Sequence, residues 1–283
     1  MTTPVVRDVR TRLGESLFAR VAGPEGPARR RRIHGTPGPR WFPEHAAIRR
    51  VHGDASMFVG GVRALLLQSL HPLAMAGVAA HSGYKGDPWG RLQRTSHFLA
   101  VTTFGTSDDA EAMVRRIRAV HKKVTGTADD GRPYAASDPH LLRWVHIAEI
   151  DSFLMAHQRF GHRPLDQAGR DEYVAETARV AEALGAVDPP RSEAELREQL
   201  AGYRPELVGT PAARAAARFI LLTPPLPAVA RLPYAAIAAA AVGMLPGWAR
   251  EELSLPALPG VVAGPAGTVI TRTIRWAMAA PPD

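Results

Sequence analysis

Apolar residues recur along most of the chain at the three- and four-residue spacing of amphipathic helices. Runs that alternate polar and apolar residues are rare, and we find no hairpin turn joining two of them. The apolar runs predict helices over residues 45–52, 57–70, 73–81, 91–104, 108–124, 140–160, 171–184, 192–200, 212–222, 234–244 and 269–277, and the weakly amphipathic residues 2–18 offer a further short one. The pattern predicts an all-α fold of about eight to eleven helices, other than a simple up-down bundle.

The run over residues 57–70 is apolar on all sides and should form a central helix. Gly60 and Gly61 would let a second helix approach it closely. His71-Pro72 interrupts the run, and Pro72 predicts a kink or a new helix start.

Residues 64–84 carry no Lys, Arg, Asp or Glu over about one membrane thickness. Polar and helix-breaking residues lie inside this stretch, among them Gln68, His71 and Pro72. We therefore interpret it as a buried helix pair, and we predict no transmembrane span.

Residues 22–43 are rich in Gly, Pro and Arg, which predicts an extended arm or linker. Residues 1–43 are accordingly assigned to an N-terminal arm and residues 44–283 to a single all-α domain. Residues 1–20 carry charges throughout and lack the apolar core of a secretory signal, which favours a cytoplasmic protein.

The chain lacks cysteine, which excludes disulfides, iron–sulfur clusters, thiolate ligation of haem and cysteine-based zinc sites. Its formal charge is +8, from 35 basic and 27 acidic residues, and nearly all the basic residues are arginine. The four arginines at 29–32 form the strongest basic patch, without interleaved aromatics or a recognisable DNA-binding motif. We therefore expect no nucleic-acid partner.

His121 lies on an apolar helix face, because Val114, Ile117 and Val124 are placed at −7, −4 and +3 from it. A histidine in this setting is either a core side chain bonded to a carbonyl or an axial ligand of haem.

Arg91, Arg94 and Thr95 are spaced i, i+3 and i+4, which places them on one side of the predicted helix over residues 91–104. They form an exposed basic face or the polar wall of a pocket. Thr95 and the apolar Phe98-Leu99 suggest a mostly buried helix, and a buried guanidinium needs an anionic partner such as a haem propionate.

His71 and His81 flank the apolar segment that begins at Pro72, and both are either structural or pocket-lining. His146 and Glu149 offer a different chemistry, because H-x-x-E places a histidine and a carboxylate on one helix face. Di-iron carboxylate proteins use two Glu-x-x-His units, and the second unit is missing here. A non-haem metal oxygenase using His146 and Glu149 is therefore the alternative to a haem site.

The order of short segments between residues 49 and 203 resembles the bacterial latex clearing proteins (rubber oxygenases) and the fungal MpaB-type oxygenases. The segments that carry this resemblance are His52-Gly53-Asp54, Gly60-Gly61, Leu65-Leu66-Leu67-Gln68, His71-Pro72, Gly77-Val78, His81-Ser82, Arg91-Leu92-Gln93-Arg94-Thr95, Phe104-Gly105, His121 with Gly126, Tyr134-Ala135, Asp138-Pro139 and Trp144-Val145-His146.

The resemblance implies a globin-like all-α domain with a buried pocket for one haem b. It implies His121 as the proximal iron ligand, with O2 opposite, and Arg91, Arg94 and Thr95 near the distal oxygen site. We assign Arg91, His71 and His81 to cofactor binding as well. Rubber oxygenases have a lysine where this chain has Arg94, and arginine does not serve readily as a neutral ligand or base.

The sequence thus predicts a haem-b-dependent oxygenase acting on an apolar small molecule of isoprenoid or polyketide type. A helical protein that only carries haem or lipid remains the non-enzymatic alternative.

Overall fold

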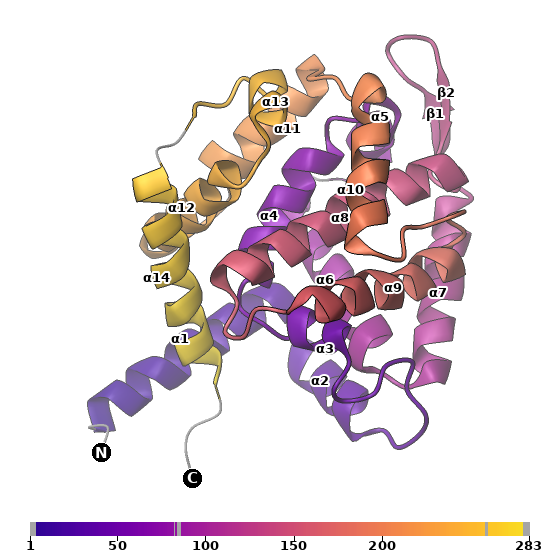
Figure 1. The fold of residues 1–283 in the computed structure, drawn as a ribbon. Helices are drawn as coiled ribbons and strands as arrows, with labels where there is room; N and C mark the ends of the chain where they lie inside the picture. Colours follow the sequence, from indigo (N-terminus) through magenta and orange to yellow (C-terminus); the bar gives the residue numbers. More distant parts are fainter. Residues whose placement is uncertain (1–3, 82, 84–85, 258–259, 280–283) are drawn as a thin grey trace.

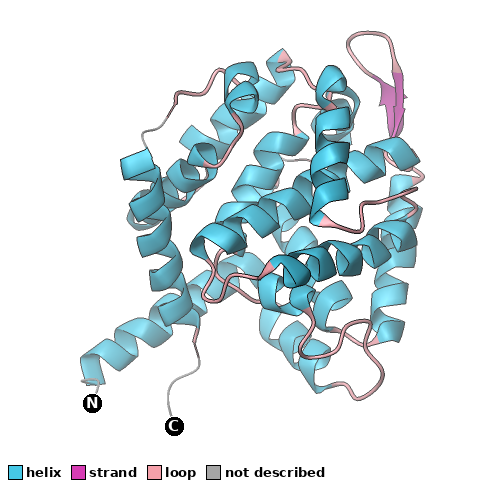
Figure 2. Cartoon of the chain, in the orientation of Figure 1, coloured by secondary structure: helices cyan, strands magenta, loops and turns pink. Residues whose placement is uncertain are grey.

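The computed structural model describes residues 4–81, 83, 86–257 and 260–279. This part of the chain forms fourteen α-helices and a small two-stranded sheet (Figure 1, Figure 2), which confirms the predicted all-α class. The elements are α1 (Pro4–Ala22), α2 (Gly26–Gly35), α3 (Ala47–His52), α4 (Met57–Gln68), α5 (Pro72–His81), α6 (Pro88–Phe104), α7 (Ser107–His121), β1 (Thr125–Thr127), β2 (Pro133–Ala135), α8 (Pro139–Phe160), α9 (Gln167–Leu184), α10 (Glu193–Gly202), the 3-10 turn η1 (Arg204–Glu206), α11 (Pro211–Leu222), α12 (Ala228–Gly243), α13 (Gly247–Glu252) and α14 (Gly260–Met278).

Helices α4 and α8 pack against each other in the centre of the molecule (Figure 1). Gly60 makes this close approach possible, because a Cβ there would lie 2.9 Å from Phe153 Cδ1. Gly61 faces open space, so the predicted close approach holds for Gly60 alone. Arg63 is buried on the same interface and donates to Asp151 Oδ2 at 2.7 Å, as a buried guanidinium requires.

Pro72 begins α5, as its missing N–H and fixed φ predict. Helices α4 and α5 meet at an angle of 108°, and His71 lies in the break between them. In the part of the chain that is described, no single helix is long and apolar enough to cross a membrane, although this bent pair together reaches the required length and apolarity. Ser82 and Tyr84, which the sequence placed next to α5, lie outside the described residues.

The prediction that the chain has no hairpin was wrong. Strands β1 and β2 pair antiparallel, with Gly126 opposite Tyr134. Each strand has three residues, too few to show an alternating pattern, and the ring of Tyr134 packs over the backbone of Gly126. The hairpin extends from one corner of the molecule (Figure 2).

The N-terminal segment also differs from the prediction of an extended arm. Residues 26–35 form α2, because Pro27 is tolerated in the first helical turn and the following Ala-Arg run has high helix propensity. Arg32, in this helix, donates to Asp109 at 2.7 Å at the start of α7. Helix α1 packs against α14 and α6, so the chain before residue 44 contacts the main body (Figure 1). The short helix α13 was not predicted either.

Candidate functional site

A small cavity of about 90 Å³ lies between α6, α7, α8 and α9, with α3 closing one side. Its wall is mostly apolar and holds three histidines and one carboxylate. The lining residues are Ile48, His52, Phe98, Leu99, Thr102, Thr103, His121, Leu142, Val145, His146, Glu149, Ile150, Phe153, Thr177, Val180, Ala181 and Leu184.

Helix α7 delivers His121 to this cavity. The helix starts at the N-cap Thr106, whose hydroxyl accepts from the Asp109 N–H at 3.2 Å. Val114 packs into the core, and Arg118 donates to the Ala183 carbonyl of α9 at 3.0 Å. His121 is the last helical residue, and its Nδ1 is buried without a hydrogen-bond partner. Burial lowers the pKa of His121, which favours the neutral imidazole.

His146 and Glu149 enter the same cavity from α8, one helical turn apart. The Nε2 atom of His146 is buried and has no partner. Burial lowers the pKa of His146 to about 4 and raises that of Glu149 to about 7. His146 is therefore neutral at physiological pH, and Glu149 is protonated in about half of the molecules at pH 7.

His52 is the third histidine of the wall, and unlike the other two it is fully paired. Its Nδ1 lies 2.9 Å from Thr103 Oγ1, and its Nε2 lies 3.4 Å from the Tyr173 hydroxyl. Burial lowers its pKa to about 3. Sequence reasoning named His52 only as part of the family resemblance, because its partners come from α6 and α9, far along the chain.

The predicted polar residues Arg91, Arg94 and Thr95 lie on α6, N-terminal to the part of the helix that lines the cavity. Phe98, Leu99 and Thr102 line the cavity, whereas Arg94 and Thr95 are exposed. Arg94 forms a surface ion pair with Asp87 at 3.1 Å. Arg91 is half-buried. The expectation of a mostly buried helix therefore holds only for its C-terminal half.

Positions 91, 94, 95, 98, 99 and 102 nevertheless share one side of α6, at the i, i+3, i+4, i+7, i+8 and i+11 spacing. The two arginines and Thr95 continue the cavity-facing stripe toward the N-terminus of the helix. The structure does not bring them into contact with the cavity that His121 lines.

The other two predicted cofactor residues lie outside this cavity. His81 is exposed, and its Nε2 lies 3.2 Å from both the Tyr134 hydroxyl and the Thr125 carbonyl of the hairpin. His71 is buried, with Nε2 3.3 Å from Glu206 Oε2, and burial is the main cause of its lowered pKa.

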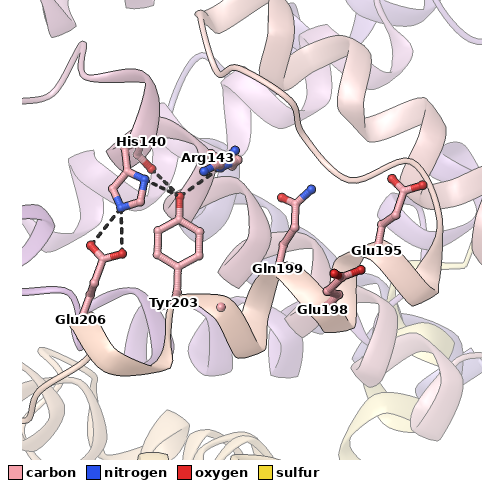
Figure 3. Close-up of a pocket in the computed structure, with 8 residues that line it drawn as sticks. His140, Arg143, Glu195, Glu198, Gln199, Tyr203 and Glu206 are labelled. Carbon is pink, nitrogen blue, oxygen red and sulfur yellow. Dashed lines mark hydrogen bonds and ion pairs between the residues drawn. The ribbon is translucent and has the colours of Figure 1, made fainter.

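Glu206, the partner of His71, lines a second, polar pocket of about 440 Å³ beside α10 (Figure 3). Its lining residues are His140, Arg143, Glu195, Glu198, Gln199, Gly202, Tyr203 and Glu206. No motif predicted this pocket, because its residues come from α8, α10 and η1 at separate places in the chain.

The donors and the apolar lining of the cavity suit a haem, but its volume does not, so the expected haem pocket is not formed in this structure. Two neutral imidazoles, His121 and His146, each have one buried nitrogen without a partner in the cavity wall. An unpaired buried polar atom costs about 1–3 kcal/mol, and coordination of iron would satisfy it. The volume of about 90 Å³ is smaller than the several hundred Å³ of ligand pockets.

Helix α6 packs mainly against α7, α1, α3 and α2 and has few direct contacts with α8 and α9 across the cavity. Because the cavity is smaller than a macrocycle, a haem would require a larger space than this structure shows, with α6 and α8 further apart.

The alternative metal site at His146 and Glu149 lacks a third ligand. Among the described residues, the one group with three His, Asp or Glu ligand atoms within 4.8 Å of one another is His71, His140 and Glu206. That group lies in the second pocket.

Comparison with known proteins gives the following matches. Residues 49–279 match the family described as ER-bound oxygenase mpaB/B′/rubber oxygenase, catalytic domain. Uncharacterised proteins of Mycobacterium bovis and Mycobacterium tuberculosis are each 31% identical over 97 residues, which is 34% of this chain. The match spans 38% of the length of these curated relatives. No solved structure matches the chain.

Proposed function

The chain belongs to the MpaB/rubber oxygenase catalytic-domain family, and from this premise we propose that it is a haem-b-dependent oxygenase acting on an apolar small molecule. Membership supports oxygenase chemistry. The substrate class of isoprenoid or polyketide type, and the haem itself, are the proposed part. The non-haem alternative at His146 and Glu149 has less support, since the cavity wall gathers no three-ligand group.

The observation that carries the proposal is the pair of unpaired nitrogens, His121 Nδ1 and His146 Nε2, in one apolar cavity. Among the described residues, seven buried side-chain atoms lack a hydrogen-bond partner, and the two on residues that line this cavity are both imidazole nitrogens. Buried polar atoms are usually paired, so a bound ligand would supply the partner here. A neutral imidazole is the form that binds iron. His121 is the proposed axial ligand, and a bound haem would supply the oxygen and redox chemistry.

The remaining wall residues would shape the reaction space. Phe98, Leu99 and Phe153 exclude water and provide an apolar surface for the substrate. Glu149 holds a proton at its carboxyl group up to about pH 7 and can donate it inside the cavity. The family resemblance and the apolar wall residues both support a site that excludes water and binds apolar molecules.

Arg91, Arg94 and Thr95 are the proposed distal donors. They lie on the cavity-facing side of α6, and separation of α6 from α8 would extend the cavity along this stripe. Their guanidinium and hydroxyl groups would then point at developing negative charge, which is the role of preorganised donors.

The haem assignment is tested by mixing the purified chain with hemin. We expect one haem per chain, with a Soret band shifted from that of free hemin. Oxygen consumption with a reductant and an apolar substrate separates an oxygenase from a carrier of haem or lipid. Stoichiometric iron in a protein without a Soret band would contradict the proposal and favour the non-haem alternative.

The distal assignment predicts that Arg94→Ala and Thr95→Ala leave folding intact but change the reactivity of the haem protein. Both side chains are exposed, so each change should alter stability by less than about 0.5 kcal/mol. A hydrogen bond to a charged group contributes about 1.5–3 kcal/mol, or roughly a tenfold to hundredfold change in rate. We expect air oxidation of the reduced haem protein to accelerate by this factor.

Arg115→Ala is the matched control, since Arg115 is an exposed arginine on α7 paired only with Glu111 at 3.7 Å. If Arg94→Ala, Thr95→Ala and Arg115→Ala all oxidise at the wild-type rate, the N-terminal half of α6 does not form the distal wall.

A further inference from the structure

Three side chains from distant parts of the chain converge beside the polar pocket. His71 comes from the break between α4 and α5, His140 from the first turn of α8, and Glu206 from η1. His71 Nε2 lies 3.3 Å from Glu206 Oε2, and His140 Nε2 lies 2.9 Å from the same oxygen. Both imidazoles therefore direct Nε2 at one carboxylate.

This spacing fits a tetrahedral metal ion. Bonds of about 2.0–2.2 Å at tetrahedral angles place ligand atoms about 3.3–3.5 Å apart. The distance from His71 Nε2 to Glu206 Oε2, 3.3 Å, lies in this range. The distance from His140 Nε2 to the same oxygen, 2.9 Å, would lengthen by about 0.5 Å around an ion. All three ligand atoms lie within 4.8 Å of one another. Two histidines and one glutamate are a ligand set that zinc uses where it keeps a fourth position open.

The side chains around the cluster hold the ligands in place. His140 Nδ1 lies 3.2 Å from the Tyr203 hydroxyl, which also receives a hydrogen bond from Arg143 Nε at 3.1 Å (Figure 3). A metal-binding histidine is typically oriented through its second ring nitrogen in this way. The His71 ring is buried against Trp144 and Tyr203, with ring centroids 6.2 and 6.5 Å away.

A second observation comes from the hydrogen bonds of Tyr203. Its hydroxyl donates to the His140 carbonyl at 2.9 Å and accepts from Arg143 Nε at 3.1 Å. The hydroxyl therefore accepts from His140 Nδ1 at 3.2 Å, which leaves Nε2 of the neutral imidazole as an acceptor 2.9 Å from the Glu206 carboxylate. A proton or a metal ion must lie between these two acceptors, and the buried His71 directs its Nε2 at the same oxygen.

The fourth position is accessible. Glu206 and His140 are 40% and 43% exposed, and both line the 440 Å³ pocket. Glu195 and Glu198 lie along α10 on the far side of Tyr203 from the metal ligands (Figure 3), and they add negative charge to the pocket. This pocket shares no lining residue with the apolar cavity of His121.

We propose that His71, His140 and Glu206 form a binding site for one divalent transition-metal ion, Zn²⁺, with an open coordination position facing the polar pocket. The ion would tie the α4–α5 break to α8 and η1. Its presence does not depend on the haem proposal, because the two sites use different residues.

The experiment uses the tag-free, full-length chain stripped of metal with a chelator. Titration with Zn²⁺ should show one ion bound per chain, and Co²⁺ in its place should give the intense visible absorption of tetrahedral cobalt. Glu206→Gln and His140→Ala should weaken Zn²⁺ binding by more than about 100-fold, beyond the effect of losing an orienting residue. Both positions are partly exposed, so these variants should fold, which circular dichroism checks.

Two further variants separate ligands from neighbours. Tyr203→Phe removes the hydroxyl beside His140 Nδ1 and should weaken binding by about tenfold, with one ion still bound. Glu198→Gln removes a carboxylate of the same pocket that is outside the cluster and should leave the affinity unchanged. Absence of stoichiometric Zn²⁺, or wild-type affinity in folded Glu206→Gln, would overturn the proposal whatever the haem content.

Discussion

His121→Ala should abolish haem binding, with the affinity for hemin falling by more than about 1,000-fold. An axial imidazole holds a b-type haem through its coordinate bond to iron, and a loss of about 4 kcal/mol corresponds to three orders of magnitude in affinity. His121 is at the end of α7 and makes no hydrogen bond through Nδ1, so its removal deletes no native pairing. The variant should therefore fold like the wild type. A hemin titration followed at the Soret band measures the effect.

His97→Ala provides the matched control. His97 is a half-buried histidine on α6 that does not line the cavity, so its replacement should leave hemin affinity unchanged. His146→Ala tests the rival ligand, because His146 Nε2 is the other unpaired nitrogen of the wall. Haem loss in His146→Ala together with wild-type hemin affinity in His121→Ala would show that His146, on α8, is the axial ligand.

Features that depend on local sequence were predicted correctly. The apolar neighbours of His121 are three, four and seven positions away, within one helix, and α7 does place His121 at a cavity. Pro72 starts a helix because its ring fixes φ, wherever the helix then packs. Gly60 lies against α8 as its small size suggested.

Features that depend on contacts between distant segments were not predictable. Arg94 and Thr95 were expected in a pocket because of their spacing, yet spacing defines only a helix side and not the depth of burial along it. The cluster of His71, His140 and Glu206 unites residues up to 135 positions apart. Neither His140 nor Glu206 belongs to a motif, so only the fold brings them together.

The protonation state of Glu149 in the cavity also depends on the fold and not on the local sequence. Glu149 was considered as a metal ligand, and ligation requires the carboxylate form. In the folded protein it is surrounded by Val145, Ile150 and Phe153, and burial raises its pKa to about 7. The protonated form is therefore well populated at neutral pH, which suits a proton donor better than a metal ligand.

Glu149→Gln should stabilise the haem-free protein by about 2–3 kcal/mol at pH 8 and have little effect at pH 4. The pKa of Glu149 is raised from 4.5 to about 7 on folding, so the native state binds the extra proton between these values. A raised folded pKa contributes stability that is fully present below the unfolded pKa and is lost as pH rises through the folded pKa. A neutral glutamine never ionises, so the variant avoids the loss of stability that the wild type accumulates between pH 4.5 and about pH 7.

The contribution of His146 to stability has the opposite dependence on pH. The measurement must therefore separate the effects of His146 and Glu149. The pKa of His146 is lowered from 6.5 to about 4, so its contribution is lost as pH falls below 6.5. The two effects partly cancel in the wild type between pH 4.5 and 6.5, so a single profile would look flat. The difference in urea unfolding free energy between wild type and Glu149→Gln removes the His146 contribution common to both.

Glu251→Gln is the control, because Glu251 is an exposed glutamate on α13, where a surface substitution should change stability by less than about 0.5 kcal/mol. An unfolding free-energy difference that stays constant from pH 4 to pH 8 would show that Glu149 ionises normally in the folded chain. In that case the cavity is wetter than its apolar wall implies. The carboxyl group would then be an anion at neutral pH, and its role as a proton donor inside the cavity would fail with it.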